Sequence, residues 1–125
     1  MPLNKKILLV DDEEGFLSVM KEALEIRGFD VATAKSAVEA GLDLSSKKPN
    51  LILMDIKMPG IDGLQACIAI KKNPDTANIP IMVVSAISEE AQIKRAHKIG
   101  ISDYFVKPVD IEKLVKRIKE ALSIQ

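Results

Sequence analysis

Four predicted strands in this sequence end in residues that can do chemistry. Their short apolar runs are typical of strands buried on both faces of a parallel sheet. The runs are followed, in chain order, by Asp11 with Asp12, by Asp55, by Ser85 and by Lys107. The carboxyl ends of parallel strands lie side by side at one edge of the sheet, where ligands bind. We therefore expect these side chains to converge on one cleft.

The carboxylates of this cleft predict a site for a divalent cation. Crowded carboxylates repel each other and resist joint ionisation unless a cation lies between them. Asp12 and Asp55, together with backbone carbonyls and water molecules, offer the all-oxygen surroundings of a hard ion. Mg²⁺ suits such a site because it keeps several waters and takes only one or two carboxylates.

Ser85 and Lys107 are the expected ligands for the oxygens of an incoming phosphoryl group. An aspartate can be the nucleophile in phosphoryl transfer, and such transfer needs mainly positioning and charge neutralisation. Asp55 is therefore the candidate nucleophile. Simpler roles stay open: Asp11 and Asp12 could cap the helix that follows, Asp12 could do both, and a buried Ser85 could bond only to backbone.

The order of the predicted elements indicates an α/β domain. Strands are predicted at 7–10, 29–34, 51–54, 81–84 and 103–106, and each is followed by helical spacing of apolar residues. Residues that favour helix starts are Ser36, Asp62, Ser88 and Asp110, before the second, third, fourth and fifth helices. Glycines that favour helix ends are Gly28 after the first helix and Gly100 after the fourth. The second helix should end near Leu44. Alternating strands and helices predict a doubly wound parallel sheet covered on both faces.

Composition and charge exclude several classes of protein. The 125 residues are 47% hydrophobic and 29% charged, which is enough for one domain with its own core. Eighteen basic residues balance eighteen acidic ones, so charge gives no reason to bind nucleic acid or an anionic membrane. The single cysteine excludes an internal disulfide, and no apolar run approaches the roughly 20 residues of a membrane helix. We expect a cytoplasmic protein.

Taken together, the motifs resemble the CheY-like receiver domain of two-component response regulators. The resemblance rests on four segments that follow strands in the right order: Asp11-Asp12, residues 54–63 (MDIKMPGIDG), Val84-Ser85-Ala86 and Phe105-Val106-Lys107-Pro108. It covers essentially the whole chain, so one receiver domain is expected over residues 1–125. It implies a flavodoxin-like fold, a five-stranded parallel sheet of order 2-1-3-4-5 with five helices.

The resemblance also implies a reaction. Asp55 would accept the phosphoryl group of a phosphohistidine on a sensor histidine kinase or phosphotransfer protein. The chain would then catalyse only its own phosphorylation and dephosphorylation. Mg²⁺ would be bound directly by Asp12, Asp55 and the backbone carbonyl of Lys57, and through water by Asp11.

Further roles implied by the resemblance concern the switch. Ser85 and Lys107 would bind phosphoryl oxygens, and Tyr104 matches the aromatic residue that turns inward when the hydroxyl moves towards the phosphate. The Lys107–Pro108 bond matches one that is usually cis, a form that X-Pro bonds adopt at modest cost. Phosphorylation would shift the population towards a conformation with a remodelled surface on the last two helices and the last strand.

The expected partners follow from these surfaces. The kinase is expected to dock on the first helix about Gly15-Phe16 and on the loop at Pro108-Val109. A downstream effector protein or output domain would meet residues of 92–99, Tyr104 and the outer face of 113–120. No direct nucleic-acid partner and no membrane are expected. The sequence leaves open whether the chain is a free-standing regulator or part of a longer protein.

Two positions depart from better-studied members of the family. Lys57, two residues after Asp55, replaces a more usual neutral or acidic residue, and Ile87, two after Ser85, is apolar. In the family these positions influence the water that hydrolyses the acyl phosphate. We hypothesise that Ile87 shields this water and that Lys57 holds the phosphoryl group, so that autodephosphorylation is slow. Serine in place of the commoner threonine lacks the stiff β-branch, so looser coupling to Tyr104 is expected.

Three other classes fit parts of the pattern. A Mg²⁺-dependent phosphatase with an aspartyl nucleophile needs a second aspartate two positions later, where this chain has Lys57. A flavodoxin needs a phosphate loop rich in Ser, Thr and Gly, where residues 11–14 are acidic and would repel phosphate. A pseudo-receiver, which binds partners without taking phosphate, remains the alternative because the presence of site residues does not prove their use.

Overall fold

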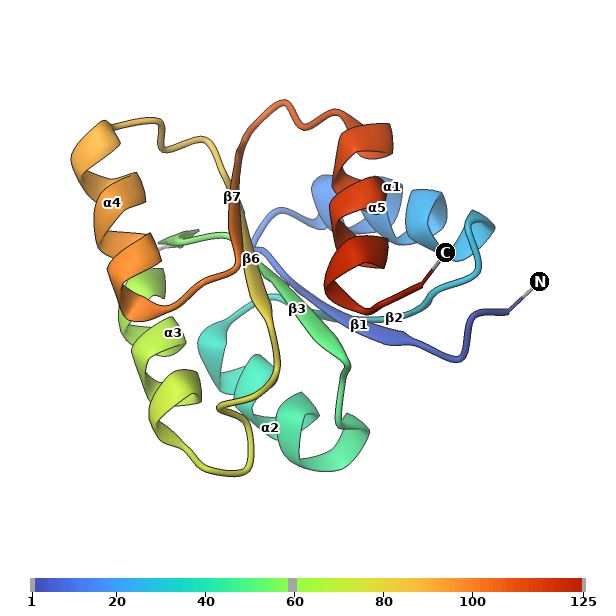
Figure 1. The fold of residues 1–125 in the computed structure, drawn as a ribbon, viewed down its shortest axis with the longest axis horizontal. Coiled ribbons are helices and arrows are strands. Elements are labelled where there is room, and N and C mark those ends of the chain that lie inside the picture. Colours follow the sequence, from blue (N-terminus) through green and yellow to red (C-terminus); the bar gives the residue numbers. More distant parts are fainter. Residues whose placement is uncertain (1, 59–60, 125) are drawn as a thin grey trace.

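A parallel five-stranded sheet forms the centre of the molecule (Figure 1). The structure is a computed structural model that describes residues 2–58 and 61–124, without the side chains of Leu42, Ile61 and Asp62. The sheet consists of β1 (Lys6–Val10), β2 (Asp30–Ala34), β3 (Leu51–Met54), β6 (Ile81–Ser85) and β7 (Asp103–Val106), in the order β2-β1-β3-β6-β7. The predicted order 2-1-3-4-5 is confirmed, because the labels β4 (Lys57–Met58) and β5 (Ile61–Asp62) belong to a separate short hairpin.

Helices cover both faces of the sheet, as the alternation of elements predicts. In Figure 1, α1 (Glu14–Ile26) and α5 (Ile111–Ala121) lie on one face, and α2 (Ala37–Lys47), α3 (Gly63–Lys72) and α4 (Glu90–Ile99) lie on the other. Successive residues of a strand point to opposite faces. Leu9 of β1 therefore packs in the core under α1 and α5, while Leu8 packs in the core under α2, α3 and α4. Within the described ranges, no helix has both the length and the apolar character needed to cross a bilayer.

Several predicted helix ends are confirmed. The Ser36 hydroxyl accepts a hydrogen bond from the backbone amide three residues later (3.2 Å) at the start of α2. The Asp110 carboxylate accepts hydrogen bonds from two backbone amides at the start of α5 (3.0 and 3.2 Å). Gly28 and Gly100, with φ of 97° and 110°, lie just beyond α1 and α4 in the left-handed region that glycine adopts without strain.

One predicted cap is wrong. Ser88 does not cap α4, because the capping position is Glu89, which makes no side-chain hydrogen bond there. Hydrogen bonds to Ile87 fix the preceding loop and leave Ser88 outside the first turn. The open alternative that Asp12 caps α1 is not observed either, because the capping position of α1 is Glu13.

The remaining predictions of helix bounds are closer to the observed helices. Helix α2 ends at Lys47 rather than near Leu44, and Lys48 follows in the left-handed region (φ 46°). Pro49 disfavours a helical conformation only at the residue before it, so the helix continues up to that point. The predicted cap of α3 by Asp62 lies outside the described side chains.

Gly63 lies against the backbone at the end of β3. A Cβ atom added at Gly63 would be 2.3 Å from the Cα atom of Ile56, which is too close for any side chain. Ile56 follows Asp55 directly, so this contact helps to fix the position of the candidate nucleophile.

We predict that Gly63→Ala lowers the free energy of unfolding by about 2 kcal/mol, because the new methyl group must push the Ile56 backbone away. Gly41→Ala is the matched control: nothing lies within 4 Å of the added Cβ, and alanine in the middle of α2 should raise stability by about 0.5–1 kcal/mol. Urea unfolding measures both effects. A Gly63→Ala protein as stable as the wild type would contradict the prediction.

Candidate functional site

The backbone of a neighbouring strand holds each main candidate residue. The amide of Asp11 donates to the last carbonyl of β2 (3.0 Å), that of Asp55 to the last carbonyl of β1 (2.9 Å), and that of Lys107 to the last carbonyl of β6 (2.8 Å). These bonds continue the parallel pairing one residue beyond the strands. The three side chains are therefore anchored to the sheet rather than carried on free loops.

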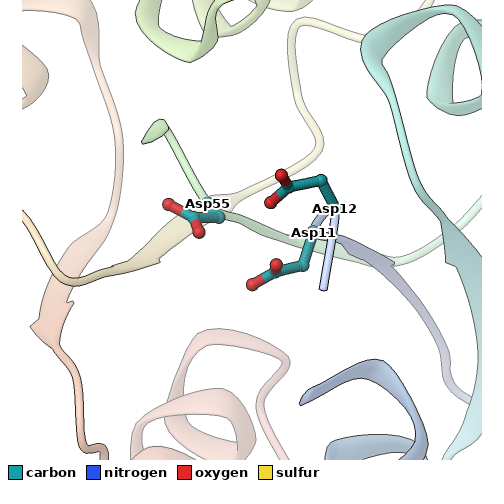
Figure 2. A group of neighbouring side chains, drawn as sticks. All are labelled: Asp11, Asp12 and Asp55. Atoms are coloured by element: carbon teal, nitrogen blue, oxygen red, sulfur yellow. The ribbon is translucent and has the colours of Figure 1, made fainter. Parts of the chain in front are cut away.

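Three carboxylates gather beyond β1 and β3 (Figure 2). Asp11, Asp12 and Asp55 each offer an oxygen atom, and these atoms lie within 4.8 Å of one another. Asp11 is 0% exposed and Asp55 is 5% exposed, whereas Asp12 is exposed to solvent. Such an all-oxygen set with one open side, where water ligands have room, fits what Mg²⁺ requires.

The ammonium of Lys107 lies among these carboxylates. Its Nζ atom is 2.7 Å from Oδ2 of Asp11 and 3.3 Å from Oδ2 of Asp55, and it is 3.7 Å from Oε1 of Glu13. The lysine side chain is only 15% exposed. A single positive charge is thus shared by three acidic groups, of which two follow β1 and one follows β3.

Burial and pairing shift the pKa values of this ion pair. Desolvation raises the pKa of Asp11 above its ordinary value, although the hydrogen bonds from Lys107 and from the Glu13 amide oppose the rise. Desolvation alone would lower the pKa of Lys107, but the hydrogen bond and charge of Asp11 and the charge of Asp55 outweigh it, so this pKa is raised. Lys107 therefore stays protonated at neutral pH.

Ser85 and Tyr104 form a second group beside the carboxylates. Ser85 is fully buried, and its hydroxyl accepts a hydrogen bond from the Ile87 amide (3.2 Å). The Tyr104 phenol donates to the Ile87 carbonyl (2.6 Å). Burial raises the pKa of the Tyr104 phenol, and hydrogen bonding with Ser85 partly opposes this. Both predicted switch residues therefore hold the same residue of the loop after β6.

The remaining predicted residues lie close to Asp55 or Lys107. The Lys57 amide donates to Oδ1 of Asp55 (2.8 Å), and the Lys57 side chain is exposed. The Lys107–Pro108 bond is cis, as predicted. Pro59 and Gly60 of the quoted motif lie outside the described residues.

Phe16 and Glu13 are contacts of Lys107 that the sequence does not reveal. The Phe16 ring centroid is 4.0 Å from the Lys107 Nζ atom. The same ring lines an apolar groove of about 550 Å³ between α1 and the start of α5, together with Val19 and Pro108. The position of Phe16, four residues after Asp12, predicts a place near the site, but the stacking on Lys107 depends on how α1 meets the sheet.

These features define a doubly wound domain with an acidic site at the carboxyl edge of its sheet. A family model described as the response regulator receiver domain matches residues 7–119, and the chain therefore belongs to this family. The predicted resemblance is confirmed, and receiver domains of response regulators are signalling domains.

Relatives and solved structures agree with this membership. The chain is 34% identical over 117 residues to the phosphate regulon transcriptional regulatory protein PhoB of Rhizobium meliloti, and 34% identical over 120 residues to the alkaline phosphatase synthesis transcriptional regulatory protein PhoP of Bacillus subtilis. These alignments cover 94% and 96% of this chain but 52% and 49% of the relatives, so the chain spans about half their length.

Two crystal structures show the same fold. One is a two-component response regulator from Clostridium difficile, with a TM-score of 0.90, 30% identity and coverage of 96% of this chain and 97% of that one. The other is the signal receiver domain of a DNA-binding response regulator from Colwellia psychrerythraea, with a TM-score of 0.90, 28% identity and coverage of 96% and 99%.

We predict that Lys107→Ala lowers the free energy of unfolding by about 3 kcal/mol in metal-free buffer, because it leaves a buried carboxylate without its partner. Added Mg²⁺ should restore part of the loss, since a cation can replace the ammonium. Lys35→Ala is the matched control: its ion pair with Glu14 is exposed and screened by solvent, so its loss should cost much less. Equal losses in the two variants, measured by urea unfolding, would contradict the prediction.

Proposed function

We propose that this chain is a phosphoacceptor receiver domain that takes a phosphoryl group from a histidine kinase or phosphotransfer protein onto Asp55. The observation that carries the proposal is the Lys107 ammonium, 3.3 Å from Asp55 Oδ2 within a cluster of acidic strand ends. The only reactions catalysed are the phosphorylation and dephosphorylation of the chain itself. The whole chain, residues 1–125, is taken as one such domain.

The proposed reaction uses Asp55 as the nucleophile. A carboxylate oxygen of Asp55 attacks the phosphorus of the donor phosphohistidine, and the P–N bond breaks as the P–O bond forms. The imidazole nitrogen leaves with the electron pair and takes up a proton. Lys107 donates hydrogen bonds to the transferring phosphoryl oxygens from its place beside Asp55, and the Ser85 hydroxyl would turn towards them.

The proposed reaction depends on Mg²⁺. Asp12 and Asp55 would hold the ion directly, with the backbone carbonyl of Lys57, and Asp11 would hold it through water. The carboxylate oxygens of the three aspartates lie close enough to share one cation. The bound ion would supply positive charge that reduces repulsion between phosphoryl oxygens and carboxylates.

The proposed switch connects the phosphoryl group to the surface. Ser85 now holds the Ile87 amide, and Tyr104 holds the Ile87 carbonyl. Turning the Ser85 hydroxyl towards a phosphoryl group would give up its bond to Ile87 and shift the loop that Tyr104 also holds. This change would remodel α4, β7 and α5 for an effector protein or output domain.

The proposed docking site for the phosphodonor protein is the apolar groove between α1 and the start of α5. Phe16, Val19, Pro108 and Val109 line this groove, and so does Lys107 of the site. A helix seated in the groove would bring a phosphohistidine towards Asp55. Direct binding to nucleic acid or membrane is not part of the proposal, and the cytoplasmic location expected from the sequence stays a prediction.

Incubation with acetyl phosphate and Mg²⁺ tests the proposal. Intact-mass spectrometry should show an added mass of one phosphoryl group on the wild type and none on Asp55→Asn, which removes the nucleophile. Asp75→Asn, in the exposed loop after α3, should be modified like the wild type. Addition of EDTA should abolish the modification, because the ion would be removed.

Failure of the wild type to gain mass, with the protein folded and Mg²⁺ present, would reject the phosphoacceptor function. The pseudo-receiver alternative would then remain. Modification that persists in EDTA would reject only the dependence on Mg²⁺.

The lifetime of the acyl phosphate is the next proposed property. Ile87 is half-buried beside Ser85, and the exposed Lys57 follows Asp55 by two residues. An apolar side chain cannot orient the attacking water, and a lysine can hold the phosphoryl group. Slow autodephosphorylation is therefore expected.

We predict that Ile87→Glu speeds the decay of the phosphorylated protein by roughly tenfold, because a carboxylate can orient the attacking water. This factor is smaller than the acceleration that a well-positioned general base supplies. Lys57→Asn should speed it by roughly threefold, as befits the loss of an exposed charge. Val38→Glu, at an exposed position of α2, is the control for added charge and should leave the decay unchanged. No acceleration in either site variant, followed by mass spectrometry after removal of the donor, would reject the hypothesis.

A further inference from the structure

An aromatic ring lies against the ammonium of the site lysine. The Lys107 Nζ atom is 4.0 Å from the centroid of Phe16, in addition to its contacts with Asp11 and Asp55. A cation within about 6 Å of a ring centroid is attracted by the ring's quadrupole, and the attraction grows as the cation loses water. The Lys107 side chain is only 15% exposed, so this contact is partly desolvated.

We propose that Phe16 is a positioning residue for phosphoryl transfer, whose ring keeps the Lys107 ammonium beside Asp55. The proposal rests on the function proposed above and names a residue that acts through the lysine, without itself touching the reacting atoms. Because the ring acts on the position of the ammonium, its loss should change the rate of phosphorylation even with a small-molecule donor that does not dock in the groove.

The ammonium needs such a constraint because its acidic neighbours compete for it. Asp11 is closer to Lys107 than Asp55 is, 2.7 Å against 3.3 Å, and Glu13 lies at 3.7 Å. Glu13 is 70% exposed, so a shift towards it would take the charge out towards solvent. A lysine has a flexible four-carbon stem, and ordering it costs side-chain entropy. An additional attraction to the Phe16 ring favours conformations in which the ammonium stays at the site.

Phe16 is itself well fixed. It lies in the first turn of α1 and is half-buried against the core under α1 and α5, which also contacts Val109 and Ile111. The ring is therefore held by the helix and the core rather than by the lysine. The ring is thus a fixed surface that the Lys107 ammonium can contact.

The competing interpretation is that Phe16 only forms a wall of the apolar groove. A wall needs apolar area, which leucine supplies, whereas attraction to a cation needs an aromatic face, which tryptophan supplies best. Phe16→Leu and Phe16→Trp therefore separate the two roles. Ile26→Ala is the control, an exposed apolar residue at the other end of the same helix.

The test measures the phosphorylation rate with acetyl phosphate and Mg²⁺, which requires no partner protein. Phe16→Leu should be slower than the wild type by roughly fivefold, the factor expected for loss of a partly desolvated cation–π contact. Phe16→Trp should stay within roughly twofold of the wild type, and Ile26→Ala should not change. Equal rates for wild type and Phe16→Leu, or equal slowing by leucine and tryptophan, would overturn the proposal.

A second readout reports the lysine directly. In NMR spectra, the side-chain protons of Lys107 should be shifted upfield by the Phe16 ring current in the wild type. The shift should disappear in Phe16→Leu and persist in Phe16→Trp, whereas a purely structural role of Phe16 would give no such pattern. Should Phe16→Leu fail to fold, Phe16→Met repeats both measurements with a flexible aliphatic side chain.

The two readouts also separate failure of this proposal from failure of the proposed function. A wild type that acetyl phosphate does not modify would reject the function, while the NMR shifts would still decide whether Phe16 positions Lys107. A modified wild type with an unchanged Phe16→Leu rate and unchanged Lys107 shifts would reject the positioning role alone.

Discussion

The ion pairing between Lys107 and the acidic strand ends is the interaction on which the rest of the site depends. Asp11 is completely buried at the end of a central strand, and a buried carboxylate is strongly unfavourable without a partner. Its partner lies 96 residues further along the chain, just beyond β7, the last strand of the sheet in sequence order. This ion pair can therefore form only when β1 and β7 both have their places in the sheet. The geometry of this polar site therefore depends on the packing of the apolar core that holds the strands together.

The proposed function places this ion pair between two surfaces. On one side, Phe16 connects Lys107 to the groove between α1 and α5, where a phosphodonor protein would dock. On the other side, Ser85 and Tyr104 hold Ile87 in the loop that leads into α4. The groove for the phosphodonor protein and the loop that leads into α4 thus lie on opposite sides of the same site. A change of charge at Asp55 would reach Phe16 through the Lys107 ammonium, and it would act on Tyr104 through its electric field.

Most of the fold could be predicted because its signals are local. Continuous apolar runs predict buried strands, and the caps at Ser36 and Asp110 predict helix starts. The hairpin of β4 and β5 was missed because strands of two residues carry no periodicity. Ser88 failed as a cap because tertiary hydrogen bonds at Ile87 decide where α4 begins. In the site, the strand ends predict which side chains meet, whereas the stacking of Phe16 on Lys107 depends on the angle at which α1 crosses the sheet.

The most direct test of the central claim is a crystal structure of the protein with Mg²⁺ and beryllofluoride, which mimics a phosphoryl group on a carboxylate. We predict beryllium bonded to an Asp55 oxygen, the Lys107 ammonium within hydrogen-bond distance of a fluorine atom, and Mg²⁺ held by Asp12 and Asp55. Beryllofluoride absent from Asp55 in a folded, Mg²⁺-containing crystal, or bound there with Lys107 turned away to Glu13, would contradict it.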